Sequence, residues 1–165
     1  APIHLEFREC NLATICHKEW DNLATTRKGK QLQLVDAADS QRVRCEVDVH
    51  RMEQVIRNIL ENAIHACGDA GTITISCKET MLGGDPALTI AVQDDGVGMT
   101  KQVAEKIFEP FFTTKQKGTG LGMAIVQRII LAHGGIISAS PVEPRGSQIV
   151  LQIPRTAALR NGVRS

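Results

Sequence analysis

The chain has 165 residues, of which 42% are hydrophobic and 22% charged, a composition typical of one globular domain with a single core. A net charge of +1 gives no global field toward nucleic acid or membrane, and 3% aromatic residues without tyrosine argue against stacking platforms for single strands. No apolar run is long enough to cross a bilayer. The five cysteines are odd in number and form no C-x-x-C motif. We therefore expect reduced structural thiols in a cytosolic compartment.

The first half of the chain alternates between helical and strand patterns. Asn11 is a predicted N-cap in front of an apolar stripe that runs to about Gly29. Residues 31–36 and 42–47 alternate in polarity, which predicts two strands that could pair as a hairpin around residues 37–41. Asp48 caps the most strongly patterned helix, which ends at Gly68–Gly71. Its apolar side chains recur at spacings of three and four: Met52, Val55, Ile56, Ile59, Leu60, Ala63 and Ile64.

The second half predicts more strands and two helices. Residues 72–78 and 87–93 are strands joined by a turn at residues 83–86. Thr100 caps a short helix to about Phe108, and residues 121–133 form an apolar-faced helix that Gly134–Gly135 close. Residues 136–140 and 147–153 are two further strands. Strands alternating with three helices indicate an open α/β layer with the helices on one face.

Asn58 and Asn62 are four residues apart on the long helix and share a face beside its apolar stripe. Asparagine inside a helix costs roughly a few tenths of a kcal/mol relative to alanine, so two of them suggest a function. An amide oxygen is a hard ligand that suits Mg²⁺, whose shell water and phosphate complete. Two amides without a ligand fit the segment equally well.

Asp95, Gly96, Val97 and Gly98 follow a predicted strand directly. A carboxylate there can accept a hydrogen bond from an exocyclic amine, and the glycines allow a tight turn close to a planar ring. Taken alone, an ordinary Asp-Gly turn is the simpler interpretation.

Residues 118–122 (G-T-G-L-G) precede a helix, where glycine N–H groups and the helix N-terminus form a seat for anions. The segment follows no strand and lacks G-K-[ST], which disfavours a dinucleotide fold and a P-loop; a flexible linker is the alternative. Before it, Phe108, Phe111 and Phe112 lie in a loop with Lys115 and Lys117. We interpret this loop as a mobile lid whose lysines neutralise phosphate. The alternative is a core role for the phenylalanines, which we favour for Phe108.

Taken together, these segments resemble the catalytic domain of sensor histidine kinases, within the wider ATPase group of gyrase, the heat-shock chaperone and mismatch-repair proteins. The resemblance covers about residues 12–153: 51–66 resemble the N box, 95–99 the G1 box, 108–112 the F box, 118–122 the G2 box and 146–150 the last glycine box. The run F-F-T-T-K before G-T-G-L-G-M resembles the nitrogen-regulation subtype. The implied fold class is α+β: a two-layer α/β sandwich (the Bergerat fold) with a mixed sheet of about five strands, three helices on one face and a mobile ATP lid.

The resemblance also implies ATP and Mg²⁺ as cofactors. Asn62 would hold the metal, Asn58 would support phosphates or metal, and Asp95 would read the adenine amine. Lys115 would reach the terminal phosphate from the lid and, with Asn58, serve catalysis. Relatives often carry Lys and Tyr where this chain has His65 and Ala66, so His65 is either a phosphate contact or an ordinary surface histidine. The implied nucleotide contacts are Asn58, Asn62, His65, Asp95, Gly98, Met99, Ile107, Thr114, Lys115, Gly118, Thr119, Gly120, Leu121, Gly122 and Ser147.

Hydrolysing relatives carry Glu at position 58, whereas Asn58 cannot act as a general base. The implied activity is therefore that of a protein-histidine kinase. None of the five histidines has the family's acceptor surroundings, so the implied partners are a missing dimerisation and phosphoacceptor hairpin and the receiver domain of a response regulator, with no nucleic acid. The alternatives are a serine kinase of the anti-sigma type and a nucleotide-sensing module without catalysis; Asn58 disfavours a chaperone- or topoisomerase-type ATPase.

The expected organisation is a trailing connector over residues 1–11, the catalytic domain over 12–154 and a disordered tail over 155–165. We expect this piece to be monomeric and its parent homodimeric. The expected location is cytoplasmic, with the question of an inner-membrane anchor in the parent left open.

Overall fold

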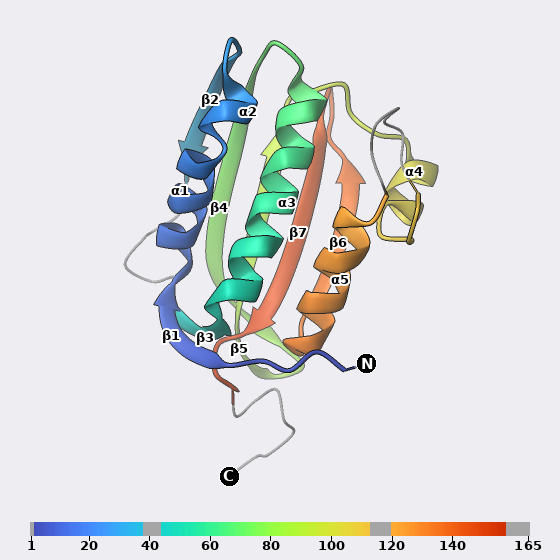
Figure 1. Cartoon of the computed structure of the whole chain (residues 1–165). Helices are drawn as coiled ribbons and strands as arrows, with labels where there is room; N and C mark the ends of the chain where they lie inside the picture. The colour runs from blue at the N-terminus through green and yellow to red at the C-terminus, as the bar shows by residue number, and fades with distance from the viewer. Residues whose placement is uncertain (1, 38–43, 113–119, 158–165) are drawn as a thin grey trace.

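The computed structural model describes residues 2–37, 44–112 and 120–157, and it has two layers (Figure 1). One layer is a five-stranded sheet of order β2-β4-β5-β7-β6. Its strands are β2 (Gln31–Asp36), β4 (Ala70–Leu82), β5 (Asp85–Asp94), β7 (Ser147–Pro154) and β6 (Ile136–Pro141). The β2–β4 pair is parallel and the others are antiparallel. The predicted mixed sheet of about five strands is confirmed.

Three helices cover one face of this sheet: α1 (Leu12–Asn22), α3 (Val49–Cys67) and α5 (Gly122–Ala132) (Figure 1). Their predicted starts are confirmed where side chains cap them: Asn11 Oδ1 accepts the N–H of Ala13 at 2.9 Å, and Asp48 Oδ1 accepts that of Arg51 at 3.0 Å. The stripe expected to reach Gly29 as one helix breaks at Leu23, after which α2 (Ala24–Arg27) follows. The short helix α4 (Lys101–Lys106) begins at Thr100 as expected, with the Thr100 hydroxyl accepting the N–H of Val103.

The strand partners near the N-terminus differ from the expectation. The predicted hairpin between residues 31–36 and 42–47 is wrong, because β2 pairs with β4. The strand β3 (Arg44–Asp48) instead pairs antiparallel with β1 (Phe7–Asn11), a segment that we expected to be connector. Alternation in polarity identifies a strand but not its partner, which here is contributed by the chain ahead of α1.

The turn between β4 and β5 is shorter than expected, because Asp85 and Pro86 already belong to β5. Gly83 and Gly84 alone make the turn, with φ of 60° and 86°. Positive φ at both central residues is what a two-residue hairpin loop requires.

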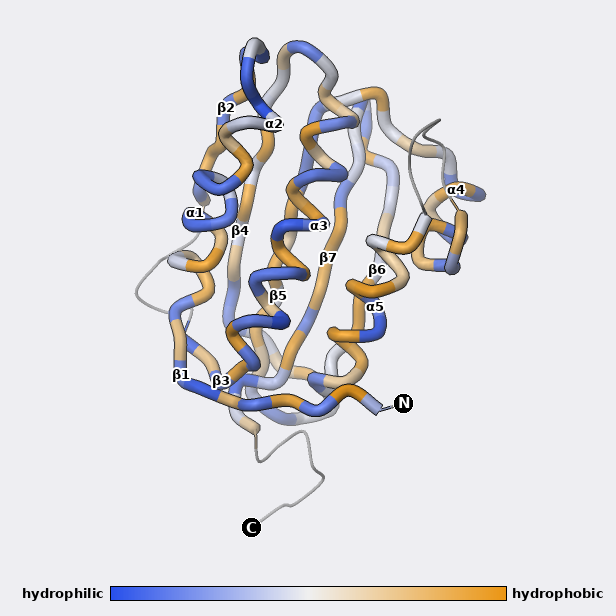
Figure 2. The backbone as a smooth tube through the Cα atoms, viewed as in Figure 1, coloured by the Kyte–Doolittle hydropathy of each residue, from blue (hydrophilic) through white to orange (hydrophobic). Residues whose placement is uncertain are grey.

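The core lies between the helices and the sheet. Figure 2 shows polar and apolar residues alternating along α3, and its apolar stripe (Met52, Val55, Ile56, Ile59, Leu60, Ala63 and Ile64) is buried. Phe108 is 9% exposed and joins this core, as favoured above. On β5 the buried side is Leu88, Ile90, Val92 and then Asp94; on β7 it is Ser147, Ile149, Leu151 and Ile153. Each apolar row thus ends in one polar residue, Asp94 on β5 and Ser147 on β7.

No helix among the described residues has the length and apolarity to span a membrane. All five cysteines lie in the described part of the chain, and none of them is in a disulfide.

Candidate functional site

Two buried polar side chains stand opposite each other where β5 ends and β7 begins. Asp94 and Ser147 are register partners and are only 4% and 3% exposed. Asp94 Oδ1 accepts the N–H of Gly96 at 2.9 Å. Burial raises the pKa of Asp94 above its ordinary value, and the backbone N–H groups of Gly96 and Ser147 act in the opposite direction. Burying a carboxyl opposes folding, so its presence here suggests a function.

Asp95, the residue that sequence reasoning selected, lies in a different environment. It is exposed, and its Oδ1 accepts the N–H of Thr72 at 2.8 Å, which ties the end of β5 to β4. A Cβ at Gly71 would lie 2.7 Å from the same oxygen, so the close approach depends on glycine. Asp94 was missed, although the period-two row Ile90, Val92, Asp94 was visible in the sequence.

The turn after Asp95 packs backbone against backbone on the end of α3. A Cβ at Gly96 would lie 2.3 Å from the carbonyl oxygen of Ala66, a contact that no side chain could fit. On the other side, Arg145 Nε donates to the carbonyl oxygen of Gly96 at 2.7 Å. Sequence reasoning missed Arg145, because nothing in the sequence places it near this turn.

A second pair of glycines closes around Asp94. Gly98 has φ of 80°, and a Cβ there would lie 3.0 Å from the carbonyl oxygen of Gly146. Gly146 has φ of 118°, and a Cβ there would lie 1.9 Å from the carbonyl oxygen of Asp94. The predicted Gly98 and Ser147 are therefore brought together by Gly146, which contacts Gly98 and the backbone of Asp94. The glycines thus let these backbone segments pack against one another next to the buried Asp94.

The predicted amides on α3 face the start of α5. Asn58 Nδ2 donates to the carbonyl oxygen of Gly122, the first residue of α5, at 3.2 Å. Asn62 is half-buried one turn further along α3. His65 is exposed, and its Nδ1 lies 2.8 Å from the carbonyl oxygen of Glu61, so the ring hydrogen-bonds to its own helix. Asn58 thus sits beside the helix N-terminus that was predicted to hold anions.

The two ends of the predicted lid meet at its base. The N–H of Phe111 donates to the carbonyl oxygen of Gly120 at 2.9 Å, and both residues have positive φ, 67° and 72°. A Cβ at Gly120 would lie 2.4 Å from the carbonyl carbon of Phe111. Of the other predicted contacts, Met99, Ile107 and Leu121 are half-buried, while Thr114, Lys115, Gly118 and Thr119 lie outside the described residues.

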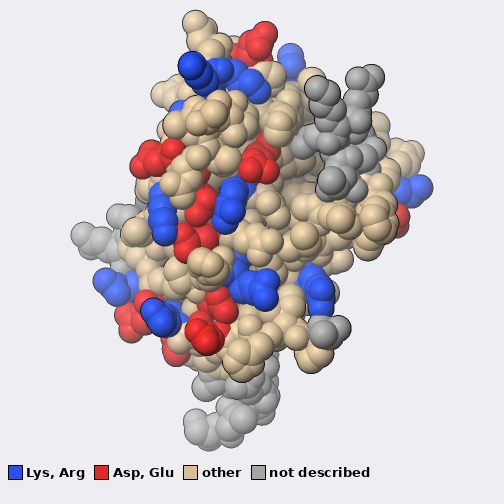
Figure 3. All heavy atoms as spheres, in the orientation of Figure 1, with Lys and Arg blue, Asp and Glu red and all other residues tan. Residues whose placement is uncertain are grey.

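Charges on the outer face of the helices largely pair with one another. Figure 3 shows acidic and basic side chains interleaved over α1 and the adjacent side of α3. Lys18 pairs with Glu53 at 2.5 Å, and Arg57 pairs with the buried Glu19 at 3.3 Å. The buried carboxyl of Asp94 is thus a feature distinct from this paired surface.

Comparisons with known proteins find a matching family and similar proteins. A family model described as histidine kinase-, DNA gyrase B- and HSP90-like ATPase matches residues 47–157. The chain is similar to the sensor histidine kinase ZraS of Salmonella typhi, with 38% identity over 153 residues that make up 93% of this chain and 32% of that protein. It is also similar to sporulation kinase E of Bacillus subtilis, with 38% identity over 75% of this chain and 16% of that protein.

Solved structures show the same likeness. The catalytic domain of histidine kinase ThkA in a nucleotide-free form has a TM-score of 0.78 at 32% identity, covering 93% of this chain and 98% of that one. ThkA in complex with response regulator protein TrrA also has a TM-score of 0.78, at 30% identity, over 93% of this chain and 43% of that one. The chain spans about a third of the length of ZraS.

Proposed function

Because the chain belongs to the histidine kinase-, DNA gyrase B- and HSP90-like ATPase family, we propose that it is the ATP-binding catalytic domain of a sensor histidine kinase. In this proposal it transfers the γ-phosphoryl group of ATP to a histidine on a dimerisation hairpin that this chain does not contain. The phosphoryl group then passes to an aspartate of a response regulator. The observation that carries the proposal is the buried Asp94 beside Ser147, enclosed by the glycine turns.

Asp94 is the better acceptor for the adenine amine. It lies on the helix-covered side of β5, whereas Asp95 is exposed and bonded to the backbone of β4. A buried acceptor that a ligand must satisfy discriminates strongly against ligands lacking the donor. We therefore assign the amine-reading role to Asp94, with Ser147 and Gly98 beside it, and the role predicted for Asp95 remains to be tested against it.

The triphosphate would lie toward the N-terminus of α5. Asn62 would supply an amide oxygen to Mg²⁺, and Asn58, which already bonds to Gly122, would support the phosphates. Bound Mg²⁺ would neutralise charge on the phosphate oxygens. The remaining proposed contacts are His65, Met99, Ile107, Thr114, Lys115, Gly118, Thr119, Gly120, Leu121 and Gly122.

The chemistry of position 58 favours transfer over hydrolysis. An amide cannot accept a proton from water at neutral pH, and the Asn58 amide N–H already donates to Gly122. Phosphoryl transfer depends mainly on positioning and charge neutralisation. An enzyme that positions ATP without activating water leaves the phosphoryl group for a nucleophile brought by another segment.

Further parts of the proposal concern the parent protein. Its partners are its own phosphoacceptor hairpin and a receiver domain, in keeping with the complex of ThkA with TrrA. We propose that this domain works in the cytoplasm and that the parent is a homodimer, while the piece alone is a monomer.

The test is phosphoryl transfer between separate fragments. This chain is incubated with γ-labelled ATP, Mg²⁺ and the hairpin fragment of the parent protein. We expect acid-labile label on the hairpin and none on a hairpin whose acceptor histidine is changed to glutamine. Acid-stable label on a serine would favour the anti-sigma-type kinase. Nucleotide binding with no transfer at all would favour a sensing module.

A further inference from the structure

Two cysteines stand directly opposite each other in the two-stranded sheet formed by β1 and β3. The register pairs Cys10 with Cys45. Directly opposed residues of an antiparallel pair have Cα atoms about 4.5–5.5 Å apart and side chains on the same face. A disulfide requires a Cα separation of about 4.4–6.8 Å. The Cα separation expected from this register therefore lies within the range of a disulfide, and the two Cβ atoms need only a small approach.

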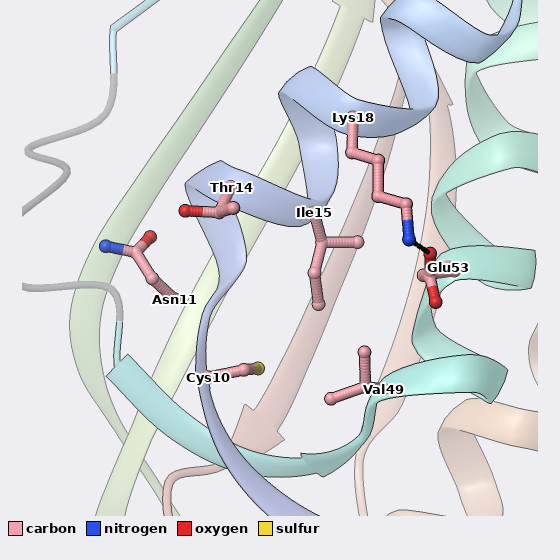
Figure 4. Close-up of a pocket in the computed structure, with 7 residues that line it drawn as sticks. All are labelled: Cys10, Asn11, Thr14, Ile15, Lys18, Val49 and Glu53. Carbon is pink, nitrogen blue, oxygen red and sulfur yellow. Dashed lines mark ion pairs between the residues drawn. The ribbon is translucent and has the colours of Figure 1, made fainter.

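The two thiols differ in access. Cys45 is 3% exposed and belongs to the core, whereas Cys10 is half-buried and packs against that core. Cys10 also lines a cavity of about 260 Å³ between β1, α1 and α3 (Figure 4). The wall of this cavity is mainly apolar, with the Lys18–Glu53 ion pair at one side. Cys45 does not line it, so a small molecule in the cavity contacts Cys10, whose register partner is Cys45.

The other three cysteines lie in environments that raise their thiol pKa. Burial raises the pKa of Cys16 and of Cys77 to about 12, and that of Cys67 to about 11. Because the thiolate is the reactive form, these three thiols react slowly at neutral pH. The β1–β3 ribbon differs from these sites in its geometry, because the half-buried Cys10 stands directly opposite a second thiol.

We propose that Cys10 and Cys45 are a reversible thiol–disulfide site that responds to small-molecule disulfides. The Cys10 thiolate attacks one sulfur of the small disulfide, forming a mixed disulfide and releasing one thiol. The Cys45 thiolate then attacks the Cys10 sulfur and releases the second thiol. The protein loses two protons and two electrons, and the small disulfide gains them as two thiols.

A disulfide between Cys10 and Cys45 would fix β1 to β3, the strand that leads directly into α3. Next to the ribbon, the N–H of Glu6 donates to Asp48 Oδ2 at 2.9 Å, and the ring of Phe7 lies edge-on to His133 with centroids 5.8 Å apart. Asp48 is both the last residue of β3 and the N-cap of α3, the helix that carries Asn58. Oxidation therefore restrains the path into the domain, and the reaction itself needs no nucleotide.

The experiment is a disulfide map of the whole chain. Reduced protein is treated with oxidised glutathione, remaining thiols are alkylated under denaturing conditions, and the protein is digested with trypsin without reduction. Trypsin places Cys10 and Cys16 together in residues 9–18 (E-C-N-L-A-T-I-C-H-K) and Cys45 in residues 45–51 (C-E-V-D-V-H-R). The Cys16→Ala variant, mapped in parallel, therefore assigns the bond.

We expect residues 9–18 linked to residues 45–51 in the unaltered chain and in Cys16→Ala, lost after dithiothreitol and absent in Cys10→Ala. We also expect the oxidised chain to unfold at a higher urea concentration than the reduced chain. Glutathione that stays on Cys10 without the second step, a bond between Cys16 and Cys77, or five alkylated thiols would each overturn the proposal. The map of the unaltered chain decides this even if a variant folds poorly.

Discussion

Replacing Asp94 by asparagine separates the effect of the buried carboxyl on folding stability from its proposed role in ATP binding. Asparagine keeps Oδ1, which can still accept the N–H of Gly96 that Asp94 accepts at 2.9 Å. It replaces the second oxygen with an N–H₂ donor, which would face the donating amine of adenine. The change therefore keeps an acceptor for the Gly96 N–H and removes the proposed contact with adenine.

The magnitude follows from one unmet buried hydrogen bond, about 1–3 kcal/mol. Since 1.4 kcal/mol is tenfold in affinity, the dissociation constant for ATP should rise roughly 5- to 150-fold. Isothermal titration calorimetry with Mg²⁺ measures this rise. Asp95→Asn is the matched control and should change the constant by less than about threefold, because its Oδ1 can still accept the Thr72 N–H.

Asp94→Asn should lower the affinity for ATP without lowering the stability of the fold. The folded-state pKa of Asp94 is raised above its ordinary 3.8, so between these two values the folded chain binds more protons than the unfolded chain. Stability from this group is then lost as the pH rises through that window. The asparagine variant, which has no such charge, should be no less stable than the unaltered chain in urea at pH 7. A large loss of ATP affinity in Asp95→Asn with none in Asp94→Asn would refute this reasoning.

Three further predictions concern the metal, the glycine contacts and the cap of α3. In Asn62→Ala, ATP affinity should no longer rise when Mg²⁺ replaces EDTA in calorimetry; a persisting rise would exclude metal binding by this amide. Gly146→Ala should lower the unfolding free energy in urea by about 1–3 kcal/mol, because its Cβ would lie 1.9 Å from the Asp94 carbonyl oxygen. Gly29 also has a positive φ, 78°, but a Cβ there would meet open space, so Gly29→Ala should cost less. Asp48→Ala should cost about 1–2 kcal/mol through the lost N-cap, and an unchanged urea midpoint would contradict it.

Asp48 also has a pH signature. Burial alone would raise its pKa, but the N–H groups of Arg51 and Glu6 and the nearby charges of His133 and Arg51 together outweigh burial and hold the pKa below the ordinary 3.8. Its contribution to stability is therefore complete above pH 3.8 and is lost as the pH falls through the folded-state value. In urea unfolding measured across this range, the gap between the unaltered chain and Asp48→Ala should narrow as the pH falls.

The elements were predictable because their signals are local. Asn11, Asp48 and Thr100 cap their helices from one side chain to a nearby N–H, and period-two alternation marks the strands. The partner of β3 was not predictable, because Cys45 pairs with Cys10 across the whole of α1 and β2. Nothing in the alternation of β3 distinguishes β1 from β2 as its neighbour.

In the candidate site too, local features were predictable and contacts between distant segments were not. The glycines were visible in the sequence, but not what each one touches: Gly96 meets Ala66, and Gly146 meets Asp94. The choice between Asp94 and Asp95 depends on the side of β5 on which each lies; the period-two row Ile90, Val92, Asp94 indicates that side, and the burial of Asp94 confirms it. For Lys115, in the lid outside the described residues, the prediction stands as the sequence made it.

The most direct test of the central claim is the choice between ATP and GTP by the unaltered chain. Calorimetry with each nucleotide and Mg²⁺ should give at least about tenfold tighter binding of ATP, equivalent to 1.4 kcal/mol. Guanine carries an oxygen acceptor where adenine carries its amine, and that oxygen would face the buried Asp94 carboxylate. Equal affinity for the two nucleotides, or no binding of either, would contradict the account.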